Sequence, residues 1–487
     1  MNAVQKRLTS LGVMLAIAGG VGAYAYFGAF KGKQKEEEQK TAEEKIASFK
    51  AADVTEVDLH SKGADFVITA SGEGEQKWHL SKPIATLADK STLEGLVNQF
   101  ADMKRKRAFD AQPDDLKSFG LEPPLATVAF KTGDKTQTYL IGKKNGFDDV
   151  VYLQRDGDTK VALVPVAAQT QTDRDLFALR DKRLAIFEDK DIAKIEVAFA
   201  PPAKGAAAKP GYTLEKKSDE WHLVGADRAD KAQVSTILSS LRFLRAKSFA
   251  AEHASDAKAY GLDKPELTVT LTVGASAATL QLAFGSVKKG TADAFFAKQG
   301  GDMPVLEIQE NMVKKLDLPA AELRDKSIAT FDRDQVKKVV LSEAGKEIVL
   351  EKKEGDAVGG WSLTAPEQKP AQDARVMNVL YKLGGLKAKS IAFEKADLVS
   401  KKSAGLETPT HEIKLMKADG TLLADVAFGA EHHDAKSSEE LYVLSQNGTR
   451  IDLIDKALMN DVKYSVTDYE KAEPVAAAAD KAPPPKP

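Results

Sequence analysis

The chain repeats one pattern of residues with a period of 140 to 144 positions, and this period constrains its fold more than any other feature. Its three tryptophans mark the period most clearly, at Trp78, Trp221 and Trp361. Each is followed by a polar residue and then by a leucine. A segment of this length is large enough to form a domain with its own core. The sequence therefore predicts three tandem copies of one structural unit.

Further landmarks recur in the same order behind each tryptophan. An acidic residue opens a helical pattern, a Gly-Leu-x-x-Pro turn follows, and a glycine marks the end of a later strand. The acidic residues are Asp89, Asp230 and Asp373; the turns carry Gly120 and Pro124, Gly261 and Pro265, and Gly405 and Pro409; the strand glycines are Gly142, Gly285 and Gly429. Because order and spacing agree throughout, we interpret these residues as structural landmarks of the repeat.

The phrase Leu-Arg-Asp-Lys closes the first two units, at residues 179–182 and 323–326. It contributes the last landmarks, which are Arg180, Asp181, Arg324 and Asp325. The third unit lacks a clear copy, and its nearest text is residues 460–463. Terminal repeats are often atypical because one of their faces has no neighbour. The departure therefore leaves the three-unit prediction intact.

The hydrophobic pattern within a unit predicts its elements. Residues 54–60 and 65–70 have the character of strands, and residues 91–107 place apolar side chains on one helical face. Four strand-like runs and a short helix at residues 172–179 follow. This order predicts an α+β fold of three tandem repeat domains, each a mostly antiparallel sheet with one long and one short helix. The tryptophans are expected to anchor each sheet to its long helix.

The predicted domain boundaries follow from these patterns and from composition. Residues 31–45 are nearly all Lys, Glu and Gln, and the C-terminal residues are rich in Ala and Pro. Neither segment offers an apolar face, so neither is expected to form a core. The predicted parts are a membrane anchor at 1–30, a charged stalk at 31–45, repeat units at 46–186, 187–330 and 331–465, and a disordered tail at 466–487.

The N-terminal segment is predicted to associate with a membrane. Lys6 and Arg7 precede an uncharged run at residues 8–30, which as a helix would span about 34 Å against roughly 30 Å of hydrocarbon. Residues 23–25, Ala-Tyr-Ala, also suit a signal-peptide cleavage site. We favour a retained anchor because the apolar run continues to Phe30. The prediction is a single pass through the inner (cytoplasmic) membrane, with the body in the periplasm.

Small residues recur at every fourth position of this segment, at Gly12, Ala16 and Gly20. Such a stripe lets two helices approach closely in lipid, so we predict a helix-packing face. The alternative is that glycine and alanine are merely frequent in such anchors.

Composition and motifs exclude several functions. The formal net charge is -2, from 70 basic and 72 acidic residues, so there is no electrostatic footprint for nucleic acid. The chain has no cysteine, which excludes disulfides and thiolate chemistry. No phosphate-binding loop, nucleophile elbow or zinc-protease motif is present. We therefore predict a non-enzymatic protein with no catalytic residues, no cofactor and no metal site.

Taken together, the tryptophan phrase, the acidic helix start, the Gly-Leu-x-x-Pro turn, the strand glycine and Leu-Arg-Asp-Lys resemble the bacterial family called domain of unknown function 4340. The resemblance covers nearly all of residues 46–465. Members of that family are typically encoded beside the permease, ATPase and auxiliary subunits of ABC-type exporters related to gliding motility. The resemblance implies an accessory or scaffold subunit of such a membrane complex. The alternative is a periplasmic module that binds a solute or an envelope polymer.

Overall fold

The computed structural model describes residues 20, 26 and 44–471, apart from residues 147, 203–206, 227, 254, 275, 353–359, 434–438 and 446–447. Most of the predicted anchor and stalk, including Gly12 and Ala16, lies outside these residues. Gly20 is described, and a side chain built there would meet no atom within 4 Å. No helix within the described ranges combines the length and the apolar character that crossing a membrane requires.

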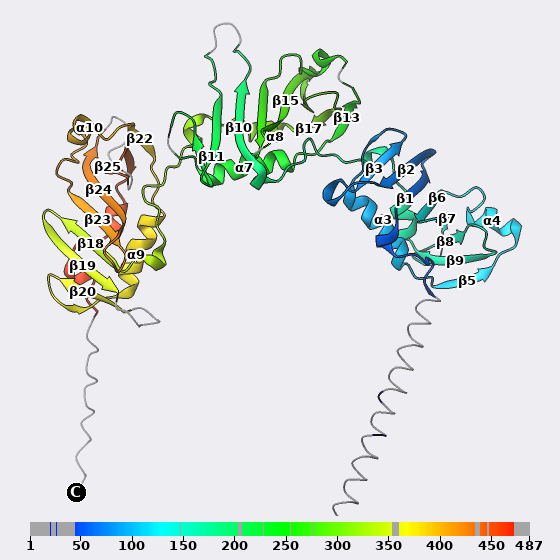
Figure 1. Ribbon diagram of the computed structural model, residues 1–487, viewed down its shortest axis with the longest axis horizontal. Coiled ribbons are helices and arrows are strands. Elements are labelled where there is room, and N and C mark those ends of the chain that lie inside the picture. The colour runs from blue at the N-terminus through cyan, green and yellow to red at the C-terminus, as the bar shows by residue number, and fades with distance from the viewer. Residues whose placement is uncertain are drawn as a thin grey trace, which may run out of the picture. The chain divides into compact units, whose positions relative to one another are not determined.

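Three antiparallel sheets with matching strand order make up the described chain (Figure 1). Their orders are β4-β3-β2-β1-β6-β7-β8-β9-β5, then β12-β11-β10-β14-β15-β16-β17-β13, and then β21-β20-β19-β18-β23-β24-β25-β26-β22. In each sheet the first strand pairs on one side with the second strand, which forms an opening hairpin, and on its other side with a later meander of four strands. The strand after the long helix then returns to the far edge. Matching orders in all three sheets explain the period in the sequence.

The strands have the following bounds. The first sheet contains β1 (Glu56–Ser61), β2 (Ala64–Ala70), β3 (Trp78–Lys82), β4 (Thr86–Leu87), β5 (Arg107–Asp110), β6 (Ala126–Thr132), β7 (Lys135–Lys144), β8 (Val150–Arg155) and β9 (Lys160–Pro165). The second contains β10 (Ile192–Phe199), β11 (Tyr212–Lys217), β12 (Glu220–Leu223), β13 (Ser248–Ala251), β14 (Leu267–Val273), β15 (Ala278–Lys289), β16 (Ala292–Gln299) and β17 (Val305–Ile308). The third contains β18 (Lys338–Glu343), β19 (Lys346–Lys352), β20 (Trp361–Ala365), β21 (Lys369–Pro370), β22 (Ser390–Phe393), β23 (His411–Met416), β24 (Leu422–His432), β25 (Glu440–Leu444) and β26 (Ile451–Asp455).

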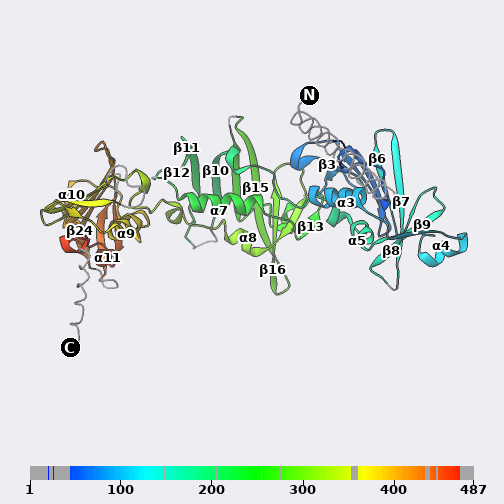
Figure 2. The same ribbon diagram turned by 90° about the horizontal axis from the view of Figure 1, so that it is seen from below.

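One long helix accompanies each sheet, as both views show (Figure 1 and Figure 2). These helices are α3 (Lys90–Asp102), α7 (Lys231–Arg242) and α9 (Asp373–Gly384). The shorter helices are α4 (Pro113–Phe119), α5 (Ala167–Thr172), α6 (Leu176–Leu179), α8 (Glu310–Lys314), α10 (Leu398–Ser403) and α11 (Leu458–Asp461).

The fold is mostly β, which corrects the predicted α+β class. The long helix ends at Asp102 and not at residue 107 as predicted, and Arg107 instead opens the edge strand β5. The chain leaves the helix because the Lys106 amide donates to the Leu163 carbonyl at 2.8 Å, which starts the pairing with β9. The predicted helix at 172–179 is replaced by the short helices α5 and α6. Three large antiparallel sheets with few helices remain.

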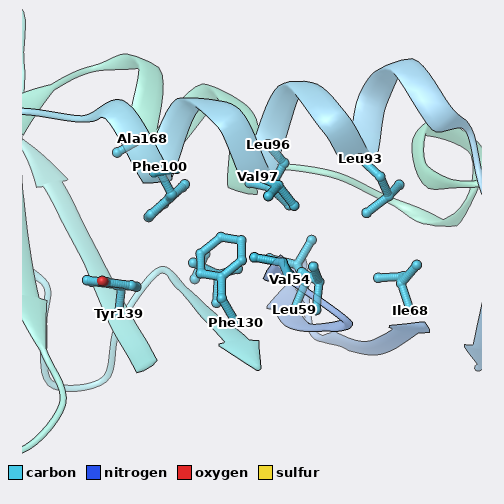
Figure 3. Close-up of a cluster of buried hydrophobic side chains, with 14 of the residues drawn as sticks. Val54, Leu59, Ile68, Leu93, Leu96, Val97, Phe100, Phe130, Tyr139 and Ala168 are labelled. Atoms are coloured by element: carbon cyan, nitrogen blue, oxygen red, sulfur yellow. The ribbon is translucent and has the colours of Figure 1, made fainter. Parts of the chain in front are cut away.

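The core of the first domain lies between α3 and its sheet (Figure 3). The strands alternate buried and exposed positions, as β1 does, because successive side chains point to opposite faces. The helix buries one face with helical spacing, which includes Leu93, Leu96, Val97 and Phe100. Figure 3 shows these side chains facing a layer that includes Val54, Leu59, Ile68, Phe130 and Tyr139.

The turn glycines and strand glycines of the repeat are packing partners. Gly120, Gly261 and Gly405 all adopt positive φ, between 67° and 69°, which favours glycine. The strand glycines lie inside β7, β15 and β24 rather than at strand ends as predicted. A side chain on Gly142 would overlap the carbonyl oxygen of Phe119, which directly precedes the turn. Gly285 and Gly429 meet the equivalent turns in the same way. In each domain the turn glycine and the strand glycine therefore allow the turn backbone to pack directly against a strand.

The chain divides into two compact units. The first comprises Met1–Gly211 and Thr236–Asp317, and the second comprises Tyr212–Ser235 and Leu318–Pro487. The connection from the first to the second sheet lies in the first unit. The connection from the second to the third sheet lies in the second unit.

Candidate functional site

The Leu-Arg-Asp-Lys segments form the junctions between successive domains. In the first junction, the Asp89 amide donates to the Leu179 carbonyl at 2.8 Å, and the Asp181 amide donates to the Leu87 carbonyl at 2.8 Å. One residue later the Lys182 carbonyl accepts from the Ala246 amide, also at 2.8 Å. The backbone of the extended segment is therefore hydrogen-bonded to the first domain up to residue 181 and to the second domain at residue 182.

The second junction repeats this backbone pattern. The Asp230 amide donates to the Leu323 carbonyl and the Asp325 amide to the Arg228 carbonyl, both at 2.8 Å. The Lys326 carbonyl accepts from the Ala388 amide at 2.7 Å. Backbone bonds at equivalent positions mean that the junction is part of the repeated architecture and not a flexible linker.

The junction arginines reach forward into the following domain. Arg180 is 2 % exposed, and its Nη1 donates to Glu252 Oε1 at 2.7 Å. Its guanidinium carbon lies 3.4 Å from the ring centroid of Phe249. Arg324 donates through Nη1 and Nη2 to the two carboxylate oxygens of Glu394, at 2.7 and 2.9 Å. A buried cation requires a partner, and here the next domain supplies it.

The junction aspartates have a local role. Asp181 Oδ1 accepts from the Arg183 amide, and both carboxylate oxygens accept from Arg183 Nε at 2.8 and 3.0 Å. Burial alone would lower the pKa of Arg183, but the hydrogen bonds and charge of Asp181 raise that pKa above its ordinary value. Asp325 Oδ1 accepts from the Ser327 amide at 2.9 Å. Each aspartate thus holds the turn by which the chain enters the next domain.

The acidic helix starts behave as predicted in the first two domains. The Asp89 side chain accepts from the Thr92 amide at 2.9 Å, and the Asp230 side chain accepts from the Ala232 amide at 2.8 Å. Burial opposes ionisation of Asp89, but hydrogen bonds from Ser91 and Thr92 lower its pKa overall. Burial also opposes ionisation of Asp230, and bonds from backbone amides and from Lys387 lower its pKa. These carboxylates are therefore helix caps with structural partners.

In the third domain the acidic residue has moved by one position. Gln372 occupies the cap position of α9, and its amide donates to the Tyr469 carbonyl at 2.7 Å. Asp373 instead accepts from the Trp361 amide at 2.9 Å. Asp373 therefore opens the helix as its first residue, whereas Asp89 and Asp230 directly precede theirs.

The end of the third domain corrects two further predictions. The counterpart of Leu-Arg-Asp-Lys begins at Tyr469 and not at residue 460, because Tyr469 and Lys471 make the junction backbone bonds, to Gln372 and Pro370. Tyr469 is 1 % exposed, so the domain continues through residue 471 and the predicted tail cannot begin at 466. Glu470 replaces the arginine and pairs with Lys369 of its own domain, at 3.0 Å. The last domain therefore presents no arginine at this position.

The three tryptophans make the same backbone hydrogen bond, but their rings differ in how deeply they are buried. The carbonyls of Trp78, Trp221 and Trp361 accept from the amides of Ala88, Ala229 and Ala371, at 2.8 to 3.0 Å. This bond ties the tryptophan strand to the segment that enters the long helix. The rings of Trp78 and Trp361 are buried, at 1 % and 4 % exposure, whereas Trp221 is only partly buried. The turn prolines Pro124, Pro265 and Pro409 each lie two residues before the start of a strand, β6, β14 and β23 respectively.

A cavity of about 550 Å³ lies at the first junction. Apolar side chains contribute most of its lining residues, among them Leu87, Phe249 and Leu306, and Arg180 and Glu252 also line it. Sequence reasoning identified Arg180 but missed Phe249 and Glu252. The signal that could have found Glu252 is the recurrence of a glutamate behind the edge strand of the third domain, at Glu394.

The family model described as domain of unknown function DUF4340 matches residues 78–228 and 221–359. Each match begins at a tryptophan strand and runs through a junction into the opening hairpin of the next domain. Together the matches cover more than half of the 487 residues. No curated protein and no solved structure matches the chain. On the strength of the two matched segments, the chain belongs to the DUF4340 family.

Proposed function

We propose that the protein is a membrane-anchored, non-enzymatic scaffold or accessory subunit of an ABC-type export complex related to gliding motility. In this proposal residues 8–30 remain as the anchor, and the three sheets are three copies of the family domain held in the periplasm. The observation that supports the proposal is that the recurrent residues of the repeat join domains and pack elements together. Arg180 and Arg324 connect successive domains, and the turn and strand glycines pack elements together.

Chains that devote recurrent residues to joining domains in series build extended contact surfaces. Exposed apolar residues on α10 are consistent with such a surface. Leu398 and Val399 are adjacent, and they are 78 % and 76 % exposed. The exporter as partner comes from the sequence resemblance, which raises the expectation by association.

The test is photo-crosslinking in cells with the full-length protein. A photoreactive residue in place of Leu398 is expected to yield adducts with a permease or auxiliary subunit of an exporter. An unrelated anchored protein with the same photoreactive residue serves as the control. Deletion of residues 1–30 is expected to abolish the adducts without unfolding the body, because the anchor supplies the local concentration. The proposal fails if no exporter subunit is enriched over the control.

A second candidate function is capture of a solute or envelope polymer. The cavity at the first junction favours this candidate, because its volume of about 550 Å³ falls in the range of small-molecule sites. Recovery of a bound small molecule, with no exporter adduct in the crosslinking experiment, would favour ligand capture over the scaffold function.

A further inference from the structure

The two junctions differ at the positions that surround the cavity. Strand pairing aligns them residue by residue, because Phe249 lies opposite Leu306 and Ile391 lies opposite Asp452. Leu306 therefore corresponds to Asp452, and Pro304, two residues earlier, corresponds to Arg450. The backbone bonds of the junction likewise align Leu87 with Arg228, because their carbonyls accept from Asp181 and Asp325.

Charged side chains occupy these positions in the second junction. Arg450 Nε donates to both carboxylate oxygens of Asp452 at 3.0 Å, and Arg450 Nη2 donates to the Asp325 carbonyl at 2.7 Å. Arg450 and Asp452 are 3 % and 0 % exposed. This buried, hydrogen-bonded pair therefore occupies the interior of the second junction. The first junction carries Pro304, Leu306 and Leu87 at the same positions, and its cavity lies there.

In both junctions the Nε atom of the arginine is buried and has no hydrogen-bond partner among the described residues, and in the first junction Arg180 also lines the cavity. Arg180 is 2 % exposed. Its single bond to Glu252 uses Nη1, whereas Arg324 engages both oxygens of Glu394. An unsatisfied buried donor is costly, so its presence beside a cavity indicates a missing acceptor.

We propose that the first junction is a binding site for a small ligand that has an apolar chain and a neutral carbonyl oxygen, as an acyl amide has. The apolar lining accommodates the chain, and Arg180 Nε donates to the carbonyl oxygen. A neutral acceptor is favoured over a carboxylate because the arginines that line the cavity already have carboxylate partners, Glu252 for Arg180 and Asp181 for Arg183. The second junction, where the buried pair Arg450 and Asp452 occupies the corresponding positions, is not expected to bind such a ligand.

The absence of native cysteines allows a direct test by cysteine protection in the full-length protein. Ala85 is exposed and lines the cavity, and Ala226, at the corresponding place in the second domain, is also exposed. Maleimide labelling of the Ala85→Cys variant is expected to slow roughly fivefold when hexanamide reaches about four times its Kd. Labelling of the Ala226→Cys variant is expected to be unaffected by hexanamide.

A second variant introduces the charged pair of the second junction at the corresponding positions of the first junction. Pro304→Arg with Leu306→Asp, in the Ala85→Cys background, is expected to fill the cavity and abolish protection. If that double change prevents folding, the Ala85→Trp variant provides the same test. Binding of hexanamide to the Ala85→Trp variant, measured by isothermal titration calorimetry, is expected to be lost. Absence of protection by hexanamide, equal protection at Ala226→Cys, or binding that survives Ala85→Trp would overturn the proposal. Stronger protection by hexanoate than by hexanamide would contradict a neutral ligand.

Discussion

At the scale of single residues, equivalent positions of the repeat are not equally buried. Trp78 and Trp361 are enclosed by the cores of their domains, whereas the ring of Trp221 is only partly covered. The backbone bond made by each tryptophan is nevertheless the same. The recurrence of the residue type therefore predicts the strand position, while the energy gained from the ring depends on the local packing.

Replacing Trp78 by alanine is expected to lower the free energy of unfolding of the first domain by about 3–5 kcal/mol, because a large buried ring is lost. The matched variant Trp221→Ala should cost clearly less in the second domain, since part of that ring already contacts solvent. Hydrogen exchange measured separately for peptides of the first and second sheets would report both values. Equal losses in the two domains would show that exposure of the ring does not determine its contribution.

At the scale of elements, the close approach of a turn to a strand depends on two glycines. The turn residue Gly120 has a φ of +69°, which a local sequence pattern can indicate. Gly142 has no such conformational requirement, and its reason lies in the neighbouring carbonyl of Phe119. Only the folded arrangement shows why the second glycine recurs.

The variant Gly142→Ala is expected to destabilise the first domain by about 1–3 kcal/mol, as overpacking does, because the obstructing atom belongs to the backbone. Gly95→Ala is the matched control. Gly95 lies inside α3, where an added side chain would meet nothing within 4 Å, so alanine should be neutral or stabilise the helix by up to about 1 kcal/mol. Chemical denaturation of both variants would test the difference. A Gly142→Ala protein as stable as the control would disprove the packing explanation.

At the scale of the whole molecule, the junctions connect the domains through bonds that recur with the repeat. Arg180 and Arg324 each bind a glutamate of the following domain, whereas Glu470 pairs with a lysine of its own domain. The third domain therefore carries an acidic side chain at the position where the first two carry an arginine.

A double-mutant cycle of Arg324→Met and Glu394→Gln is expected to give a coupling energy of about 0.5–1 kcal/mol. The value is modest because the Glu394 side chain is 68 % exposed, so solvent screens the pair. The exposed helical pair Glu310–Lys314 is the control, with an expected coupling of about 0.3 kcal/mol. Stability of the third domain, followed by hydrogen exchange, is the measurement. A junction coupling no larger than that of the helical pair would argue against the junction as a specific connection.

Local properties of the sequence were sufficient for several features. Spacing located the three tryptophan strands, and apolar periodicity located the long helix of the first domain, since both patterns depend on residues close together in the chain. Turn chemistry located Gly120, Gly261 and Gly405, whose positive φ depends on local sterics. These features together were enough to predict three domains built largely from antiparallel strands.

The tertiary structure alone decided what depends on distant residues. The edge strand β5 forms because β9, more than fifty residues later, supplies its hydrogen-bond partner. The true end of the third domain is set by the bond between Gln372 and Tyr469, nearly one hundred residues apart. Arg180 was visible as a landmark, but its partner Glu252 and the cavity beside them arise only where two domains meet. Strand register and domain contact determine these features, and no short stretch of sequence encodes either one.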